Sequence, residues 1–254
     1  MIDIHSHILP GVDDGASAME EAVNMARLAL DEGITKIIAT PHHQNGIFFN
    51  KKQDILKGVK ELNHILRSKD IPLEVFPGQE TRIYGELLND FENGDILSLN
   101  HTNYLFVELP SGYVPRYTEQ LLFEIQLKGL TPIIVHPERN AEIVKNPDKL
   151  LTLVKKGALT QLTASSLTGH FGKTTQKFSM QLIEANSAHF IASDVHNTST
   201  RSFRMRESIS TVHKEFGSQV VYYFQENAEL LLQGQTVYRQ EPSKIKYKKF
   251  LGLF

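Results

Sequence analysis

The chain has 254 residues, of which 41% are hydrophobic, and a formal net charge of -2 from 27 basic and 29 acidic side chains. This length suits one α/β barrel, because such barrels often run to about 200–250 residues as a single domain. The balanced charge lacks the strongly basic character of a nucleic-acid binder, so no nucleic-acid partner is expected. The absence of cysteine excludes disulfides, thiolate metal ligands and cysteine nucleophiles.

The start of the chain shows no basic segment followed by an apolar one, so no secretory signal peptide is expected. The sequence also lacks the run of about 18 apolar residues that a membrane-spanning helix requires. We therefore expect a cytoplasmic protein that is not inserted into a membrane.

Short apolar, β-rich runs alternate along the chain with amphipathic helical patterns. Ser17 and Glu20 form a capping-box pattern and Gly33 a stop signal, which together predict the first helix. The expected strands are residues 1–5, 34–40, 73–78, 104–109, 131–136, 158–164 and 188–193. The expected helices are residues 17–33, 51–68, 86–92, 117–129, 147–157, 173–186, 202–216 and 227–234, while 219–224 fits either a strand or a buried helix.

This alternation predicts a parallel sheet whose strands are connected by helices. Seven consecutive βα units favour a closed or nearly closed barrel, and a doubly wound open sheet is the alternative. Residues 240–254 differ in composition, being basic and then apolar, and are expected to form a tail after a domain of residues 1–239. This tail could dock a partner or pack on its own barrel.

Imidazole and carboxylate side chains gather at the C-terminal ends of the expected strands. His5 and His7 close the first strand as His-x-His, so strand alternation places both on one face, where they can bind one ion. The other candidates are Asp13 or Asp14, His42, Glu80, Glu108, His136, Asp194 and His196. The C-terminal strand ends of a βα barrel converge on one mouth, so this pattern predicts a metal cluster there.

Glu108 lies in the strongly apolar run YLFVEL, where an uncompensated carboxylate is costly. Its partner is expected to be a metal ion or, alternatively, an Arg or Lys. Mixed imidazole and carboxylate ligands without thiolate suit Zn, Mn or Fe, and several carboxylates favour Mn or Fe. Glu80 could bridge two ions about 3.5–4 Å apart. Five further histidines, at positions 64, 101, 170, 189 and 213, are given no role.

These residues carry a family resemblance that runs from Met1 to about residue 235. The chain resembles the PHP (polymerase and histidinol phosphatase) superfamily, and most closely its manganese-dependent protein-tyrosine phosphatases of bacterial polysaccharide loci, the YwqE/CpsB type. The motifs are His5-Ser6-His7 with Asp13-Asp14-Gly15, Thr40-Pro41-His42, Gly78-Gln79-Glu80, Val107-Glu108-Leu109, His136-Pro137-Glu138-Arg139 and Ser193-Asp194-Val195-His196. Gly-Gln-Glu departs from the commoner Gly-Ala-Glu, but the ligand Glu80 is kept.

The resemblance implies a distorted seven-stranded (β/α)7 TIM-like barrel with three metal ions. It implies a first ion held by His5, His7, Glu80 and Asp194, a second by Glu80, Glu108 and His136, and a third by Asp14, His42 and His196. Mn2+ is the implied ion, with two or three bound, and Fe, Zn, Co or Mg as substitutes.

The expected reaction is hydrolysis of a phosphate monoester by a metal-bridging hydroxide, without a phosphoenzyme. Arg139 and Arg201 lie beside metal motifs, and a planar guanidinium is a natural bidentate clamp for phosphate, although each could instead form a surface or ligand-orienting ion pair. The resemblance supports both as phosphate binders. It also implies phosphotyrosine proteins as substrates, with a bacterial tyrosine kinase as partner and polysaccharide synthesis as the regulated process.

Four alternatives to a protein-tyrosine phosphatase stay open. They are a histidinol-phosphate-like small-molecule phosphatase, a metal-dependent nuclease or proofreading module, an amidohydrolase, and a non-enzymatic module that binds phosphotyrosine. The near-neutral charge argues against a nuclease. Amidohydrolase sites often use a carboxylated lysine as bridge, whereas Glu80 is the apparent bridge here. A deep pocket closed by loops would favour the small-molecule phosphatase.

Overall fold

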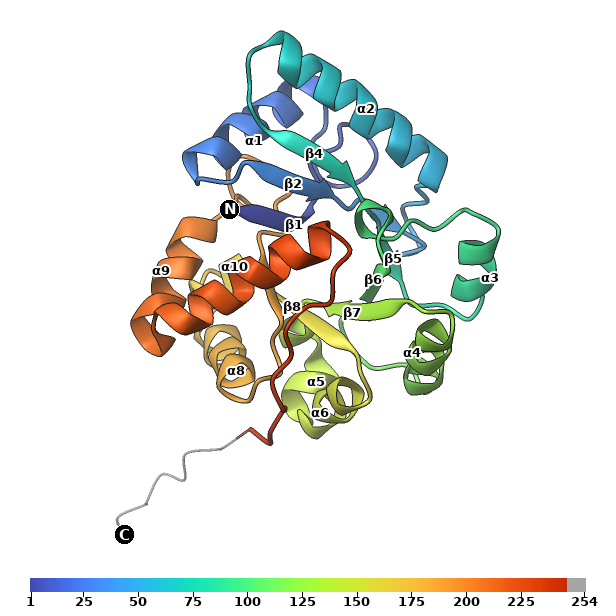
Figure 1. Ribbon diagram of the computed structural model, residues 1–254, viewed down its shortest axis with the longest axis vertical. Helices are drawn as coiled ribbons and strands as arrows, with labels where there is room; N and C mark the ends of the chain where they lie inside the picture. Colours follow the sequence, from blue (N-terminus) through green and yellow to red (C-terminus); the bar gives the residue numbers. More distant parts are fainter. Residues whose placement is uncertain (246–254) are drawn as a thin grey trace.

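Parallel strands form the inner part of the molecule and helices surround them (Figure 1). The computed structural model describes residues 1–245, and the structural statements that follow concern that range. The strands are β1 (Ile2–Ser6), β2 (Lys36–Ala39), β3 (His42–His43), β4 (Glu74–Pro77), β5 (Glu80–Arg82), β6 (Tyr104–Glu108), β7 (Thr131–Val135), β8 (Leu159–Thr163) and β9 (Phe190–Ala192). One sheet has the order β1-β2-β4 and the other β3-β5-β6-β7-β8-β9.

The predicted parallel α/β fold is confirmed, but a closed seven-stranded barrel is not. The expected strands 34–40 and 73–78 form β2 and β4. Each is followed by a short strand that was not predicted, β3 or β5, which belongs to the other sheet. Pro41, which has no N–H to donate, separates β2 from β3. Gly78 precedes β5, and a Cβ there would lie 2.7 Å from the Ile38 side chain, so this close crossing requires glycine. A single bridge, Ser6 to Val195, joins the end of β1 to the segment after β9.

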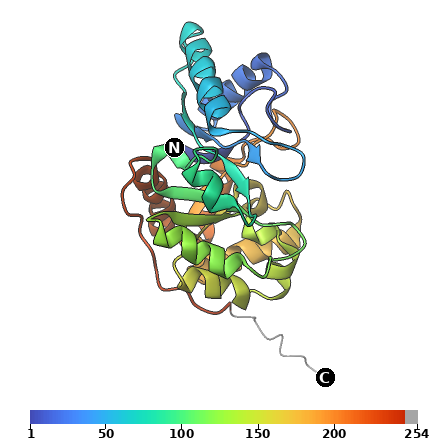
Figure 2. The same ribbon diagram turned by 90° about the vertical axis from the view of Figure 1, so that its right-hand side faces the viewer.

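The helices cover the outside of the strands. They are α1 (Met19–Asp31), α2 (Lys52–Ser68), α3 (Leu87–Glu92), α4 (Thr118–Leu127), α5 (Ala141–Lys145), α6 (Asp148–Lys155), α7 (Ala164–Leu167), α8 (Lys173–Glu184), α9 (Met205–Phe216) and α10 (Ser218–Leu232). Short 3-10 helices lie at Leu99–His101 and Pro137–Arg139. Seen from the side, α1 and α2 stand over the three-stranded sheet at one end of the molecule (Figure 2).

One sequence-based detail of the helices is wrong, and one open alternative is decided. The Ser17–Glu20 capping box does not form, because Ala18 is the N-cap of α1 and the Ser17 hydroxyl donates to Glu21 instead. The segment 219–224 is helical and belongs to α10, in which Phe224 and Leu231 are buried, so the buried-helix alternative holds there.

Alternation along the strands creates apolar surfaces on both sides of the six-stranded sheet. On β6, Tyr104 and Phe106 join an inner cluster, whereas Leu105 and Val107 join the larger cluster beneath the helices. A parallel sheet covered on both faces leaves its strand ends as the place where polar groups can gather.

The expected tail is described only to residue 245. Its first part packs on the molecule, because the Ser243 N–H donates to the Ala185 carbonyl and the Asn186 side chain donates to the Glu241 carbonyl. Residues 246–254 lie outside the described range. Among the described residues, no helix combines the length and the apolar composition that crossing a membrane demands.

Candidate metal centre

Glu80, at the start of β5, lies at the middle of the polar cluster and is fully buried. Its Oε2 lies 3.3 Å from His5 Nε2 and 3.4 Å from His7 Nε2. The same oxygen lies 2.8 Å from His42 Nδ1, and Oε1 lies 2.8 Å from His136 Nε2. Four imidazoles therefore converge on a single carboxylate, two from within strands β1 and β3 and two from just after β1 and β7.

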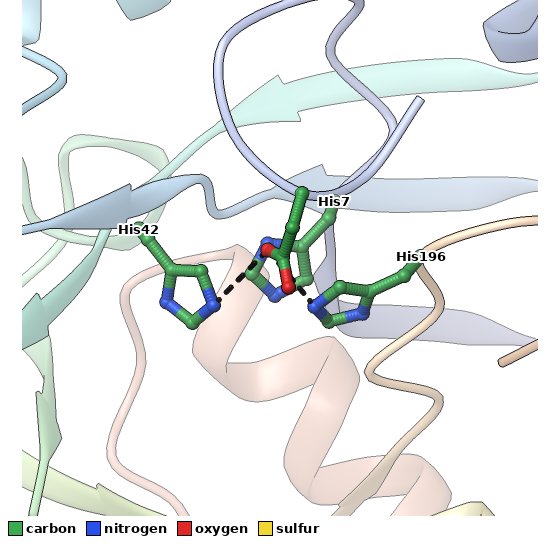
Figure 3. Close-up of side chains that lie close together, drawn as sticks. His7, His42 and His196 are labelled. Atoms are coloured by element: carbon green, nitrogen blue, oxygen red, sulfur yellow. Dashed lines mark ion pairs between the residues drawn. The ribbon is translucent and has the colours of Figure 1, made fainter. Parts of the chain in front are cut away.

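A second convergence surrounds Asp14 (Figure 3). Its Oδ1 lies 3.4 Å from His42 Nε2 and 3.5 Å from His196 Nε2. The His7 ring stacks 3.8 Å from the His196 ring, centroid to centroid, and so closes the group. The adjacent Asp13 serves differently, because its Oδ2 accepts a 2.6 Å hydrogen bond from His7 Nδ1. Asp14 rather than Asp13 thus faces the other imidazoles.

Several histidines have one ring nitrogen satisfied and the other free. His5 Nδ1 donates to Gln161 Oε1 at 2.9 Å, and His196 Nδ1 donates to the Asp194 carbonyl at 2.9 Å. The Nε2 atoms of His5, His7 and His196 are buried without a hydrogen-bond partner among the described residues. Metal-binding histidines show this arrangement, in which an oxygen acceptor fixes the ring while the other nitrogen coordinates. The donor set therefore fits divalent ions.

The side chains fall into three overlapping groups. Ligand atoms lie within 4.8 Å of one another in His5, His7 and Glu80, in His42, Glu80 and Glu108, and in His7, Asp14, His42 and His196. The first and third groups contain residues expected for the first and third ions. Asp194 adjoins the first, its Oδ1 lying 3.4 Å from His7 Nε2. In the second group, His42 stands where His136 was expected.

Sequence reasoning missed Arg82 as a member of the site. Its Nε and Nη2 donate to the two carboxylate oxygens of Glu108, each at 2.9 Å, which is the bidentate geometry of a strong ion pair. Arg82 and Glu108 are also paired in register between β5 and β6. The signal was present in the sequence, because Arg82 follows Glu80 by two residues on the same strand and alternation places both on one face. Glu108 therefore pairs with an arginine, which was the alternative to a metal ion. Its Oε2 also lies 3.8 Å from His42 Nδ1, within the candidate metal centre.

The two predicted arginines both reach the cluster. Arg139 Nη1 donates to Asp194 Oδ2 at 2.5 Å, and its guanidinium lies 5.2 Å from the centre of the Phe171 ring. Arg201 Nη2 lies 3.3 Å from Asp194 Oδ2, and its Nη1 lies 3.5 Å from Asp14 Oδ2. Both side chains are about one-third exposed, so they can meet an anion at the mouth of the cluster.

The electrostatics favour ionised Glu80 and neutral His136, whereas nearby carboxylates outweigh burial and raise the pKa of His5, His7 and His42. Burial opposes ionisation of Glu80, but the ion pairs with His42 and His5 outweigh it and hold the pKa of Glu80 well below its usual range. Burial, with a contribution from Arg139, lowers the pKa of His136 to about 4. An ionised carboxylate and a neutral imidazole are the forms that coordination requires.

Two candidate ligands occupy the left-handed region of backbone conformation. His136 has φ 34° at the end of β7, and Asp194 has φ 55° after β9. Non-glycine residues rarely adopt this conformation. At both positions the chain turns away from the direction of the preceding strand, and this is where the side chain enters the cluster.

This parallel α/β fold, with a histidine and carboxylate cluster bordered by arginines, defines a metal-centre protein of the hydrolase type. The chain belongs to the family described as capsular polysaccharide synthesis, CpsB/CapC, whose sequence model matches residues 1–233.

Its relatives are similar over their full length. The tyrosine-protein phosphatase YwqE of Bacillus subtilis (strain 168) is 51% identical over 254 residues, which is 100% of each chain. The putative tyrosine-protein phosphatase CapC of Staphylococcus aureus is 39% identical over 254 residues, again 100% of each chain. A solved structure from a study of B. subtilis YwqE and Streptococcus pneumoniae CpsB, described as unique metal-dependent tyrosine phosphatases, has a TM-score of 0.95 and 51% identity. It covers 97% of this chain and 100% of that one.

Proposed function

We infer that this chain is a metal-dependent phosphotyrosine-protein phosphatase. The observation that carries the inference is the buried set of unpartnered imidazole and carboxylate atoms, bordered by two arginines, in a chain 51% identical to a protein of that activity. Cysteine is absent, so a phosphocysteine intermediate has no residue to form on.

We assign separate roles to the residues of the site: some would hold the ions and others would bind phosphate. We assign His5, His7, Asp14, His42, Glu80, Glu108, His136, Asp194 and His196 to the ions. Bound divalent ions would supply a water of lowered pKa and neutralise phosphoryl charge. Arg139 and Arg201, held by Asp194, would clamp the remaining phosphoryl oxygens.

The relatives favour a macromolecular substrate over a small one. The chain is 51% identical to one tyrosine-protein phosphatase and 39% identical to a putative one, in each case over its full length. We therefore take a phosphotyrosyl side chain projecting from a protein as the group that enters the metal centre.

Mn2+ is the ion we propose, with two or three bound, and the partner we propose is a bacterial tyrosine kinase together with its substrates in capsular polysaccharide synthesis. The mixed imidazole and carboxylate donors suit Mn2+. The family's capsular polysaccharide description supports the cellular process. A cytoplasmic location and a division into a catalytic domain of residues 1–239 and a tail of residues 240–254 belong to the same proposal.

The test is hydrolysis by purified protein after chelation, with and without added Mn2+. The substrates are a phosphotyrosine peptide, a phosphoserine peptide and histidinol phosphate. Mn2+-restored activity selective for the phosphotyrosine peptide supports the proposal. Metal-dependent activity on histidinol phosphate alone would keep the site and replace the substrate. Inactivity on all three substrates would overturn both the proposed metal site and the proposed substrate.

A further inference from the structure

Exposed apolar side chains cluster on the two loops that flank the metal centre. Among the described residues these are Ile47 and Phe49, in the loop after β3, and Tyr113 and Tyr117, in the loop between β6 and α4. We call these four side chains the rim surface. Both loops follow the C-terminal ends of strands that carry candidate ligands, so the rim surface lies on the face where the metal centre opens.

The loop between β6 and α4 is attached to the segment that follows Arg82. The Tyr117 hydroxyl donates to the Ile83 carbonyl at 3.3 Å. The Ile83 N–H in turn donates to the Glu108 carbonyl at 2.9 Å. This loop is therefore held beside the Arg82–Glu108 pair of the metal centre.

Each loop is also fixed to a candidate site residue. Phe48 stacks nearly parallel to His42, with an interplanar angle of 8° and 6.2 Å between ring centroids. Asn140, next to Arg139 in sequence, donates through its side-chain amide to the Tyr113 carbonyl at 3.0 Å. A molecule that touches the rim surface thus contacts loops that pack on, or hydrogen-bond to, residues of the metal centre and their neighbours.

The loop after β3 is held in shape by its own hydrogen bonds. Asn45 Oδ1 accepts from the backbone N–H of Ile47 at 3.0 Å and of Phe48 at 2.8 Å, and the Gln44 N–H donates to the Phe48 carbonyl at 3.0 Å. A loop ordered before binding loses less conformational entropy when a partner arrives. Yet Ile47 is 82% exposed on this ordered loop, with its side chain offered to solvent.

We propose that the rim surface binds the protein segment on either side of the phosphorylated tyrosine, through apolar side chains next to that residue. This inference rests on the proposed function, because the phosphotyrosyl group must enter the metal centre. Aromatic side chains are enriched at protein interfaces, and apolar patches beside an active site mark interaction surfaces. The metal centre would hold only the phosphotyrosyl side chain, so the residues on either side of it would contact the loops around the centre.

The experiment compares a phosphotyrosine peptide with apolar flanking residues against free phosphotyrosine, which has no flanking residues. The variant is Ile47→Ala/Tyr113→Ala, which removes one side chain from each loop without adding charge. We expect the ratio of kcat/KM for the peptide to that for free phosphotyrosine to fall about tenfold, as for truncation of interface residues that contribute strongly to binding.

The matched control is Phe123→Ala/Leu127→Ala on α4. These side chains are 53% and 69% exposed, against 58% for Tyr113 and 82% for Ile47, so a comparable but somewhat smaller exposed area is removed outside the rim surface. The ratio should stay at the wild-type value in the control. An unchanged ratio in the rim variant, or an equal fall in the control, would overturn the proposal. A smaller oligomer in the rim variant than in the wild-type protein would also overturn it, by assigning the surface to a second copy.

A measurement on the wild-type protein keeps the proposal testable if the rim variant folds poorly. Peptides whose flanking residues are changed from apolar to glycine and serine should lose about the same factor in kcat/KM. Equal rates for the two peptide series would contradict the proposal. Inactivity of wild-type protein on every phosphotyrosine substrate would instead be a failure of the proposed function.

Discussion

Replacing Arg82 with alanine tests whether Glu108 belongs to the metal centre. The pair is nearly buried, with side-chain exposures of 24% for Arg82 and 7% for Glu108. Removing one partner of a fully buried pair costs about 3–5 kcal/mol. Because Arg82 is partly exposed and Glu108 can relax toward water, we expect a loss of about 2–3 kcal/mol for the metal-free protein.

Thermal unfolding of chelated and Mn2+-loaded protein gives the readout. In a domain of this size 1 kcal/mol shifts Tm by about 2–4 °C, so chelated Arg82→Ala should melt about 4–12 °C below wild type. Bound metal would neutralise Glu108, so loading should recover much of this difference. Burial, with the neighbouring Glu80, raises the pKa of Glu108 to about 7. Measurements at about pH 8 therefore keep Glu108 ionised.

Two variants complete this experiment. Arg82→Lys keeps the positive charge but cannot form the bidentate contact. The Tm difference between Arg82→Lys and wild type therefore measures the contribution of the bidentate geometry, and the remaining difference to Arg82→Ala measures that of the charge. Arg27→Ala removes an exposed arginine of α1 that donates only to Asn24, and should leave Tm unchanged. An equal Tm loss in chelated and loaded Arg82→Ala would refute metal coordination by Glu108.

Four further outcomes are expected. His136→Ala should lower kcat by about a hundredfold while the circular dichroism spectrum is retained, with the exposed His64→Ala as control; an unchanged rate would remove His136 from the site. Chelation should lower Tm and divalent ions should restore it, because coordination satisfies the buried unpartnered atoms; a metal-independent Tm would contradict the ligand assignment. Arg139→Lys should reduce kcat/KM by about 10–100-fold by loss of the bidentate clamp, and equal kinetics would exclude phosphate contact. Burial, with Arg239 contributing, lowers the pKa of His189 to about 3, so the folded state binds fewer protons than the unfolded one. Stability from this group is full above about pH 6.5 and falls at lower pH by about 1.4 kcal/mol per pH unit, so His189→Gln should flatten the slope of unfolding free energy between about pH 6 and 4.

The sequence predicted the convergence of the ligands because a strand has a simple period. His5 and His7, two apart, point to one face, and parallel strands bring their C-terminal ends together. The short strands β3 and β5, beyond Pro41 and Gly78, were not predicted, nor was their pairing in the other sheet. That pairing depends on contacts such as Gly78 against Ile38, which are far apart in the chain.

The partner of each charged group was the harder part of the site to predict. Glu108 could have met a metal ion or an arginine, and only the register between β5 and β6 brings Arg82 opposite it. Likewise, neighbouring carboxylates at positions 13 and 14 are equivalent in sequence. The loop sends Asp13 to His7 Nδ1 and Asp14 to the imidazoles of His42 and His196.

The left-handed backbone at His136 and Asp194 has a cost in stability at positions whose side chains are candidate metal ligands. A side chain in this conformation costs about 1–2 kcal/mol relative to glycine, which adopts it freely. Glycine would relieve this cost at either position, but at position 194 it would also leave Arg139 and Arg201 without their carboxylate partner. The backbone cost is thus retained at two positions whose side chains the metal centre would need.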